Sequence, residues 1–403
     1  MTGTADAVVI GGGVNGASAA YHLAVRGAGR VLLLDVPSPR AATAKSGAML
    51  TLHHPSLEQS VLAYKGLTSL HAFAELTGSD VGFVRTGIVQ LLPARHAEQM
   101  RRNLAEQQAA GLPVAELPLA DLAAMLADGD FSDVGAAVLE PESGYADPLR
   151  TVWAYRDAAV RAGARIEACR ALRIRHRGGR VLGVETEQGT VAAPTVVLAA
   201  GAWSAGLLAG LGIDLGLSTR RVQVVGFRTR QAGRARRPVV LDQVTGAWVR
   251  PDAETSVLAG LELGLPVAGP DEGDEGVDQS YVELCRARLA GRFPALADAP
   301  MRGGWAGLIA MGPGGRPVVD RLAEAAGLYC AVGDSGGAFK TAPVVGEHLA
   351  EWIVHGGPQS TDLLPLARTR VHDTARADGY GRFGSAAGLT RELRRLRQTT
   401  KSE

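Results

Sequence analysis

The hydrophobic residues at the start of the chain fall into two short runs with a longer segment between them. Residues 5–10 form an almost continuous apolar run, which is typical of a strand buried in a parallel sheet. No basic segment precedes this run, which favours a strand over a signal peptide. Residues 14–26 predict a helix that ends at Gly27, and residues 30–35 predict a second strand that ends at Asp35. The pattern therefore predicts a strand–helix–strand unit.

The turn between the first strand and the helix carries glycines at a motif spacing. Gly11, Gly13 and Gly16 match G-x-G-x-x-G, with Val14 and Asn15 at the start of the helix. In this motif the first glycine allows a tight turn, the second lets the backbone approach a pyrophosphate, and the third lets the helix lie close to the strand. The helix N-terminus also presents backbone N–H groups to a phosphate. The turn therefore predicts a dinucleotide-binding site.

The acidic residue at the end of the second strand supports this interpretation. Asp35 lies 19 residues after Gly16, close to the ~20 residues expected for the acid that binds a ribose hydroxyl. A carboxylate at this place also disfavours a nucleotide that bears a 2′-phosphate. Strand, glycines, helix, second strand and acid agree, which favours dinucleotide binding over a glycine-rich turn with a purely structural role.

Two later segments also combine a strand with glycines or other small residues. Residues 163–189 predict a small excursion of β-structure, and residues 195–204 predict a return strand that ends in small residues. Residues 327–342 predict a strand and a glycine loop, followed by a helix from about Pro343 to His355. Three such segments suit a long cofactor threaded through one domain. They favour FAD over NAD, for which the first segment usually suffices.

The remaining segments predict a second, β-rich part of the chain. Residues 83–91 predict a pair of strands about a turn, and residues 221–229 and 247–260 also have the pattern of strands. Residues from about 374 onward include a basic stretch at 391–397. This stretch predicts a solvated terminal helix, a loose tail or a contact between subunits rather than a nucleic-acid site.

Composition narrows the class of protein. A chain of 403 residues is long enough for two domains, and it is 46% hydrophobic and 21% charged, as in ordinary globular proteins. A net charge of +1 favours neither nucleic acid nor a membrane surface as a partner. Cys169, Cys285 and Cys330 lie too far apart to suggest a disulfide framework or a metal site. We therefore expect a cytoplasmic protein with no bound metal and no membrane span.

Taken together, the motifs resemble the FAD-dependent D-amino acid oxidase superfamily, on its sarcosine oxidase and glycine oxidase side. The resemblance covers most of the chain to about residue 370, and the order and spacing of its pieces are those of the family. The pieces are GGGVNGASAAYHLA at 11–24, TAKSGAML at 43–50, GYADPLR at 144–150, ETEQGTVAAPTVVLAAGAWS at 185–204, WVRPD at 248–252, WAGL at 305–308 and GDSGGAFKTAPVVGEHLAEWI at 333–353.

The resemblance implies the fold class and the domain organisation. It implies an α/β domain combined with an α+β domain: a Rossmann-type FAD-binding domain and an antiparallel-sheet substrate domain, as in p-hydroxybenzoate hydroxylase. The FAD-binding domain would comprise residues 1–80, 145–222 and 300–370. The substrate domain would comprise residues 81–144 and 223–299, and residues 371–403 would form the C-terminal basic helix or tail.

The resemblance also implies which residues contact the cofactor. The segment from Lys45 to Met49 would run beside the flavin ring. In addition to Asp35 and the residues of the first turn, the predicted FAD contacts are Ser46, Gly47, Ala48, Met49, Leu172, Ala200, Gly201, Trp203, Gly333, Asp334, Gly336, Gly337, Ala338, Phe339 and Lys340. A covalent-flavin cysteine has no convincing match, and Cys330 lies in a predicted buried strand. We therefore expect FAD to be bound noncovalently.

Three basic residues are candidates for the chemistry. Related sarcosine oxidases place a lysine that binds the substrate carboxylate at the position of Lys340, in the predicted loop before the last helix; a salt bridge or a surface position is the alternative. Arg250 lies in a predicted strand, where its guanidinium suits a bidentate carboxylate and equally a structural ion pair. Lys45 would activate oxygen or contact phosphate. His53 or His54 would line the site or form a covalent link to flavin. The alternative is that they have no role in the site and belong only to the segment that leads into a helix or to the surface.

The function implied is oxidation of the C–N bond of a small amine or amino acid, of the sarcosine, glycine or D-amino acid type. Hydride passes to the flavin, and oxygen then reoxidises the flavin to give peroxide. One alternative is an FAD-dependent 2-hydroxy acid dehydrogenase or oxidase, which needs a base, most simply a histidine, near the substrate hydroxyl. Another is an FAD-binding subunit of a larger oxidase complex. Otherwise we expect a monomer or homodimer.

Overall fold

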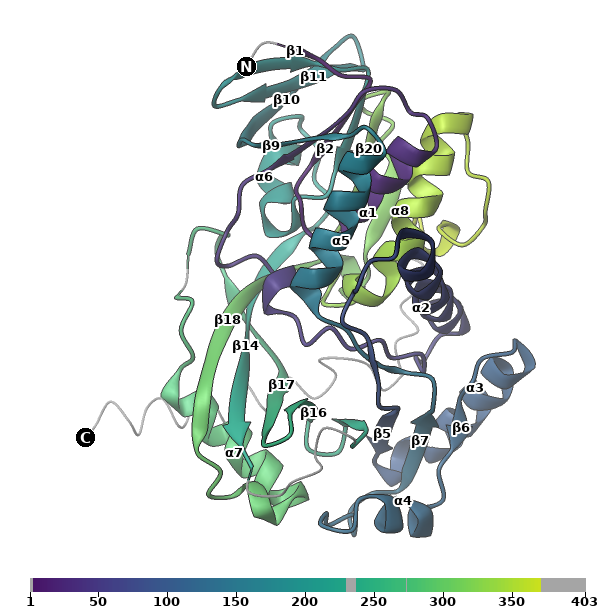
Figure 1. Ribbon diagram of the computed structural model, residues 1–403, viewed down its shortest axis with the longest axis vertical. Helices are drawn as coiled ribbons and strands as arrows, with labels where there is room; N and C mark the ends of the chain where they lie inside the picture. The colour runs from purple at the N-terminus through teal and green to yellow at the C-terminus, as the bar shows by residue number, and fades with distance from the viewer. Residues whose placement is uncertain (1–2, 230–236, 273, 371–403) are drawn as a thin grey trace.

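A six-stranded sheet forms the centre of the upper half of the molecule in Figure 1. The computed structural model describes residues 3–229, 237–272 and 274–370. The strand order is β19 (Val318–Arg321), β20 (Leu328–Val332), β13 (Thr195–Leu198), β2 (Ala7–Ile10), β3 (Val31–Asp35) and β9 (Arg165–Ala168). All neighbours are parallel except β19 and β20. The parallel strands predicted near residues 5–10 and 30–35 are thus confirmed.

Both faces of this sheet are covered, which explains the continuous apolar runs in its strands. Val9 and Leu33 pack on the helical side, in a core that includes residues of α1 (Val14–Val25), α5 (Pro148–Arg161) and α8 (Ala338–His355). Val8 and Leu34 pack on the other side. That side is covered by α6 (Ser204–Ala209) and by a four-stranded sheet of β1 (Gly3–Thr4), β12 (Gly189–Ala192), β11 (Arg180–Thr186) and β10 (Ala171–Arg177).

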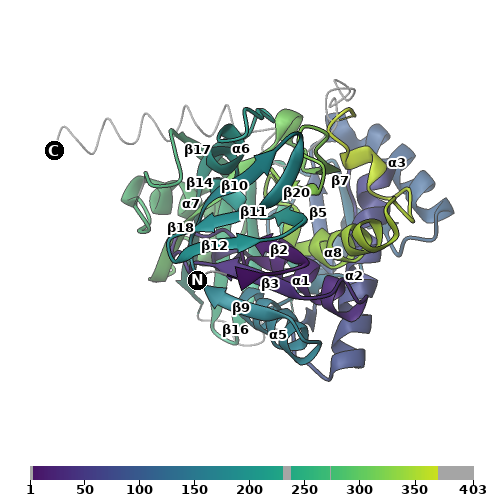
Figure 2. The ribbon, with the colours of Figure 1, turned by 90° about the horizontal axis from the view of Figure 1, so that it is seen from above.

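Helix α2 (Leu57–Thr77) joins this helical layer because a glycine lets it come close to α8. A Cβ atom on Gly66 would lie 1.9 Å from the carbonyl oxygen of Lys340, so only glycine fits at this crossing. In the view from above, α1, α2 and α8 lie side by side (Figure 2). The N-terminal turn of α8, which carries Lys340, is therefore held in place by the backbone of α2.

The lower half of the molecule in Figure 1 is built on an eight-stranded sheet. Adjacent strands in this sheet are antiparallel, except for the parallel pair β15–β5. The strand order is β18 (Met301–Met311), β14 (Ser218–Arg228), β17 (Ser256–Val267), β16 (Ala247–Ala253), β15 (Val239–Asp242), β5 (Ile88–Leu92), β7 (Ala136–Glu140) and β6 (Ala115–Glu116).

Alternation along these strands separates two faces of the sheet. Val225, Val249 and Ala259 pack with Tyr281 and Leu284 of α7 (Gln279–Arg292) in one core. Helices α3 (Ala97–Ala109) and α4 (Leu119–Met125) lie beside β6 and β7 (Figure 1). Other residues of β14, β16 and β18, with Val222, Trp248 and Ile309 among them, contribute to the wall of a cavity that borders the half of the molecule built on the six-stranded sheet.

The strand pair predicted at 83–91 is wrong in its pairing. Strands β4 (Val84–Arg85) and β5 exist, but they do not pair with each other. Val84 pairs with Tyr145 of β8 (Gly144–Tyr145), and Ile88 pairs with Glu140 of β7. Residues 84–92 therefore continue in one direction along residues 136–145, and Gly87, with a φ of 73°, bends this ribbon rather than reversing it.

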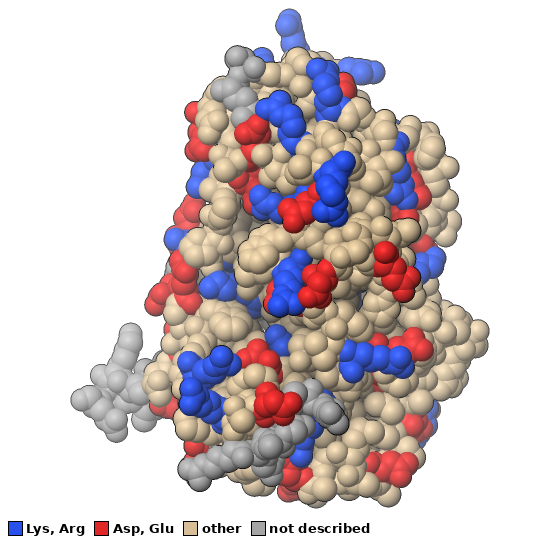
Figure 3. Space-filling model, in the orientation of Figure 1, with Lys and Arg blue, Asp and Glu red and all other residues tan. Residues whose placement is uncertain are grey.

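The sequence predicted no membrane span, no charged surface for nucleic acid or membrane, and a basic C-terminal tail. No helix in the described part of the chain is long and apolar enough to cross a membrane. Basic and acidic side chains are interspersed on the face shown in Figure 3, so this face carries no extended patch of one sign. The basic tail predicted at 371–403 lies outside the described residues.

A fully buried carboxylate connects the two halves of the molecule. Glu140, at the end of β7, accepts hydrogen bonds from Thr51 Oγ1 at 2.9 Å, Leu52 N at 2.7 Å, Gln90 Nε2 at 2.7 Å and Ser143 Oγ at 2.8 Å. These donors come from three separate segments. Residues 51–52, which follow the segment predicted to run beside the flavin, are thereby fixed to the eight-stranded sheet.

Replacing Glu140 with glutamine should destabilise the fold. The amide of the new side chain would turn N–H donors toward groups that are themselves donors, and buried donors without an acceptor cost free energy. We expect Glu140→Gln to lower the free energy of unfolding by about 2 kcal/mol or more, measured by urea unfolding. The exposed Glu75 on α2 provides the control, because Glu75→Gln should change stability by less than about 0.5 kcal/mol. Equal effects of the two substitutions would contradict the role assigned to Glu140.

Candidate functional site

The turn from β2 into α1 requires glycine for steric reasons. A Cβ atom on Gly16 would lie 1.8 Å from the carbonyl oxygen of Gly11, and one on Gly11 would lie 2.5 Å from the carbonyl oxygen of Ala199. Gly11 also has a φ of 101°, which L side chains rarely adopt. Helix α1 thus packs tightly on the turn. Its N-terminal residue Gly13 provides no side-chain cap, and Val14 N donates to Thr43 Oγ1 at 3.3 Å.

A cavity of about 560 Å³ extends from this turn along the carboxyl ends of the parallel strands. This is the edge at which open α/β sheets bind their ligands. The three predicted segments meet here although they are far apart in the sequence. The predicted residues that line this cavity are Gly11, Gly13, Val14, Asn15, Asp35, Leu172, Ala200, Gly201, Trp203, Gly333 and Asp334. Gly16 is absent from the lining because it packs against Gly11.

The carboxylate of Asp35 is fixed from two sides. Its Oδ1 accepts a hydrogen bond from Gly12 N at 2.8 Å, and its Oδ2 lies 2.9 Å from Nη1 of Arg156. Arg156 comes from α5 and is a residue that the sequence analysis missed. Nothing in the sequence marks it, because it lies 121 positions after Asp35 and belongs to no motif. The contacts with Gly12 and Arg156 together orient the carboxylate of Asp35 at the cavity wall.

A second cavity, of about 130 Å³, adjoins the first and shares Val14, Thr43 and Asp334 with it. The remaining predicted contacts gather here. They are Lys45, Ser46, Gly47, Ala48, Met49, Gly336, Gly337, Ala338, Phe339 and Lys340. The eight-stranded sheet supplies the opposite part of the wall, so this cavity lies between the two halves of the molecule.

The backbone of both loops beside the second cavity is strained. Among the described residues other than glycine, positive φ values occur at Ala48, with 49°, and at Ser335, with 53°. Ala48 N donates to Ser46 Oγ at 2.9 Å, and Ser335 Oγ donates to the carbonyl oxygen of Gly333 at 3.1 Å. Strained residues of this kind gather at functional sites, where the surrounding structure holds them.

Lys340 lies in a helix, and the predicted start of that helix at Pro343 is wrong. Helix α8 begins at Ala338, so Lys340 is in its first turn with only 4% of its surface exposed. The bend at Ser335 and Gly336 turns the chain early enough for the helix to start before the proline. Pro343 then removes one hydrogen bond from the second turn, which the packing of α8 tolerates.

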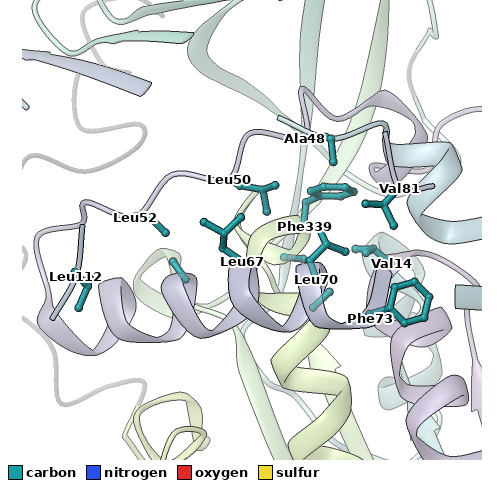
Figure 4. Packing of buried hydrophobic residues seen from close by; sticks show 14 of the residues in the cluster. Val14, Ala48, Leu50, Leu52, Leu67, Leu70, Phe73, Val81, Leu112 and Phe339 are labelled. Carbon is teal, nitrogen blue, oxygen red and sulfur yellow. The ribbon is translucent and has the colours of Figure 1, made fainter. Parts of the chain in front are cut away.

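Phe339 anchors this turn in the hydrophobic core. Its ring lies among Ala48, Leu67, Leu70 and Val14, and it is 7% exposed (Figure 4). The same residue lines the second cavity. The core therefore sets the position of the helix turn that carries Lys340.

Arg250 and Lys45 occupy different surroundings. Lys45 lines the second cavity, and its carbonyl oxygen accepts a hydrogen bond from Trp305 Nε1 at 2.9 Å. Arg250 is 6% exposed and does not line this cavity; its guanidinium lies over the ring of Tyr145, 4.2 Å from the ring centre. Burial lowers the pKa of Arg250. Its predicted contact with substrate remains a prediction.

His53 and Cys330 are buried, whereas His54 is only partly buried. His53 is buried, its Nδ1 lies 2.7 Å from Oε1 of Gln107, and burial lowers its pKa. Neither His53 nor His54 lines the second cavity. Cys330 is fully buried in β20, as predicted, and burial raises the pKa of its thiol to about 12.

The sequence analysis missed the cavity wall that comes from the eight-stranded sheet. Leu241, Trp248, Leu261 and Glu262 line the cavity, together with Gln223. The motif pieces at 248–252 and 305–308 reach this wall, but no rule of spacing identifies which of their residues face it. Only the register of the sheet provides that information.

Comparison with known proteins agrees with this geometry. A family model described as FAD dependent oxidoreductase matches residues 6–352. The chain is 28% identical over 364 residues to 4-methylaminobutanoate oxidase (formaldehyde-forming) of Paenarthrobacter nicotinovorans, which covers 87% of this chain and 44% of that protein. It is 27% identical over 385 residues to glycine oxidase of Geobacillus kaustophilus, covering 92% of this chain and 98% of that protein.

A solved structure extends the comparison to the fold. L-proline dehydrogenase from P. horikoshii superposes with a TM-score of 0.84 at 24% identity, covering 93% of this chain and 99% of the other. The chain thus matches the full length of some relatives and spans less than half of the length of 4-methylaminobutanoate oxidase. On the match to residues 6–352, the chain belongs to the family of FAD-dependent oxidoreductases of the D-amino acid oxidase type, as its motifs predicted.

Proposed function

We propose that the chain binds FAD noncovalently and oxidises the C–N bond of a small amine or amino acid. The observation that carries this proposal is the pair of adjoining cavities, one along the strand ends and one between the two halves. Two relatives, an oxidase of 4-methylaminobutanoate and an oxidase of glycine, support an amine or amino acid as substrate.

The residues of the larger cavity fit the nucleotide part of FAD. The pyrophosphate would lie at the N-terminus of α1, where backbone N–H groups and the helix dipole favour an anion. Asp35 would accept hydrogen bonds from the ribose hydroxyls. The steric requirement at Gly11 and Gly16 supports this assignment, because it keeps the backbone turn open to the cavity. Leu172 and Trp203 would flank the nucleotide.

The smaller cavity would hold the reacting end of the cofactor and the substrate. Bound FAD supplies the acceptor for a hydride from the carbon next to the substrate nitrogen. Lys340 would bind the substrate carboxylate. A cation in the first turn of a helix is opposed by the helix dipole and by burial, so an anion near Lys340 lowers its free energy. Lys45 would contact the reaction site or assist the reaction with oxygen, and Arg250 would support the carboxylate beside Tyr145.

Several finer proposals accompany this one. We propose the p-hydroxybenzoate-hydroxylase-like division, with residues 1–80, 145–222 and 300–370 as the FAD-binding domain and 81–144 and 223–299 as the substrate domain. Reoxidation by oxygen to give peroxide, a cytoplasmic location and a monomeric or homodimeric state remain predictions. The 2-hydroxy acid alternative is disfavoured because no histidine of the described chain lines the smaller cavity.

Anaerobic titration of the purified FAD-loaded protein tests the function. Visible absorbance is followed while glycine, N-methyl amino acids, cyclic imino acids, D- and L-amino acids and 2-hydroxy acids are added in turn. We expect an amine or amino acid to bleach the flavin band. Bleaching by 2-hydroxy acids alone would replace the proposal with the hydroxy acid alternative, and a protein that does not bind FAD would contradict the cofactor assignment.

Asp35→Asn should weaken FAD binding. The substitution keeps the shape of the side chain. It removes the negative charge of the carboxylate, which would accept hydrogen bonds from the ribose hydroxyls and which forms an ion pair with Arg156. We expect the dissociation constant of FAD to rise about tenfold or more, measured by the fluorescence change of added FAD. Asp6→Asn is the control, because Asp6 bonds Arg30 at an exposed site and does not line the cavity. An unchanged affinity of Asp35→Asn would argue against this placement of the ribose.

Lys340→Met should weaken substrate binding without releasing FAD. Methionine is similar in length and apolar, so it suits the buried site, but it cannot bind a carboxylate. A charge-assisted hydrogen bond of ~1.5–3 kcal/mol corresponds to a ~10–100-fold rise in the substrate concentration for half-maximal anaerobic reduction. Lys65→Met, which removes a half-exposed lysine bound to Asp362, should leave that concentration unchanged. If both variants behave alike, Lys340 does not bind the carboxylate.

A further inference from the structure

The eight-stranded sheet is irregular at the point where it borders the smaller cavity. Val222 of β14 pairs with Gly264 of β17, and Val224 pairs with Gly260. Between these pairs β14 has one residue and β17 has three, with Glu262 in the middle. Bulges of this kind redirect side chains and are frequent beside active sites. Glu262 N donates to the carbonyl oxygen of Gly246 at 2.8 Å, which fixes the backbone of the bulge.

An aromatic ring is built into the wall beside this bulge. A Cβ atom on Gly260 would lie 2.7 Å from the indole of Trp248, and one on Gly47 would lie 3.3 Å from it. Two glycines, one in the sheet and one in the segment predicted to run beside the flavin, therefore make room for the ring. Trp248 and Glu262 both line the cavity. A carboxylate together with an aromatic face is a combination that recognises organic cations.

The charges around the cavity come from different elements. Lys340 comes from α8, Lys45 from the segment before residues 46–49 and Asp334 from the loop before α8, whereas Glu262 comes from the sheet. Most of the remaining sheet wall is apolar, with Leu241, Leu261 and Ile309 among its residues. A cavity that has two lysines on one side and a carboxylate on the wall formed by the sheet suits a substrate that carries both charges.

We infer that Glu262 selects substrates with a cationic nitrogen over 2-hydroxy acids of the same size. This inference rests on the proposed function and names the substrate class of the same site, a small zwitterionic amino acid or N-alkylated amino acid. Lys340 takes the carboxylate, and Glu262 with Trp248 takes the nitrogen end. A 2-hydroxy acid has no cation for Glu262, so the half-buried carboxylate opposes its binding.

The chemistry of amine oxidation gives Glu262 a role during the reaction as well. The ammonium group of the bound substrate first gives up a proton to water. The neutral amine then loses hydride when its C–H bond breaks and the electron pair of that bond leaves for the cofactor. The nitrogen lone pair then forms the C=N bond, and the nitrogen becomes positively charged. A carboxylate beside the nitrogen stabilises this developing charge. Oxidation of a 2-hydroxy acid, in contrast, ends in a neutral carbonyl group.

The test uses two ligands of equal shape that differ in charge. Glycine betaine carries a permanent ammonium charge and has no lone pair, so it binds without being oxidised. The compound 3,3-dimethylbutanoate replaces its nitrogen with carbon. Both are titrated into the FAD-loaded protein, and binding is read from the perturbation of the visible absorbance. We expect the wild-type protein to bind glycine betaine at least about tenfold more tightly, and Glu262→Gln to reduce that ratio to about one.

Three controls make the outcome decisive. Glu283→Gln changes an exposed glutamate on α7 and should keep the wild-type ratio. Glu262→Asp keeps the charge and should keep part of the preference, which covers the case in which Glu262→Gln does not fold. FAD content is measured for each variant. No preference in the wild-type protein, or an unchanged ratio in Glu262→Gln, overturns the inference. A charge preference in a protein whose flavin no amine reduces overturns the proposed function instead.

Discussion

The site depends on how closely helix α1 packs against the strand that precedes it. A side chain at Gly16 would collide with the Gly11 carbonyl, and a side chain at Gly11 would collide with Ala199, which follows the neighbouring strand β13. Because both contacts involve rigid backbone, no side-chain movement relieves them. The close approach brings the first and second glycine-rich segments to one edge of the sheet, and the larger cavity follows from that meeting.

The second half of the molecule is attached to this edge through polar groups that are fully satisfied. Glu140 accepts hydrogen bonds from three separate segments, and the strand that carries it belongs to the eight-stranded sheet. A buried network of this kind is stabilising only when every member has its partner. It fixes residues 51–52 to the sheet. The preceding segment at 46–49 is therefore held at its C-terminal end by Glu140 and packs through Ala48 against the core around Phe339.

The sequence predicts well what local chemistry determines and poorly what register determines. The buried parallel strands, the glycine turn and the acid at Asp35 were predictable, because burial on both faces and close backbone approach restrict the residue types allowed. The pairing of residues 84–92 was not, because a short apolar run is compatible with several partners. Arg156 was also beyond reach, since it meets Asp35 only through the packing of α5 on the sheet.

The start of α8 shows how the limits of prediction from sequence affect Lys340, a candidate residue for substrate binding. A proline suits the first turn of a helix, so sequence alone places Lys340 in a loop, where a lysine is free to choose its orientation. In the structure Lys340 is buried in the first helical turn, fixed by Phe339 on one side and by Gly66 of α2 on the other. A cation that is held rigidly and opposed by the helix dipole is stabilised most by an anion bound at one fixed position beside it. The fold therefore supports Lys340 as an orienting group more strongly than the motif does, because rigidity rather than residue type gives the site its geometry.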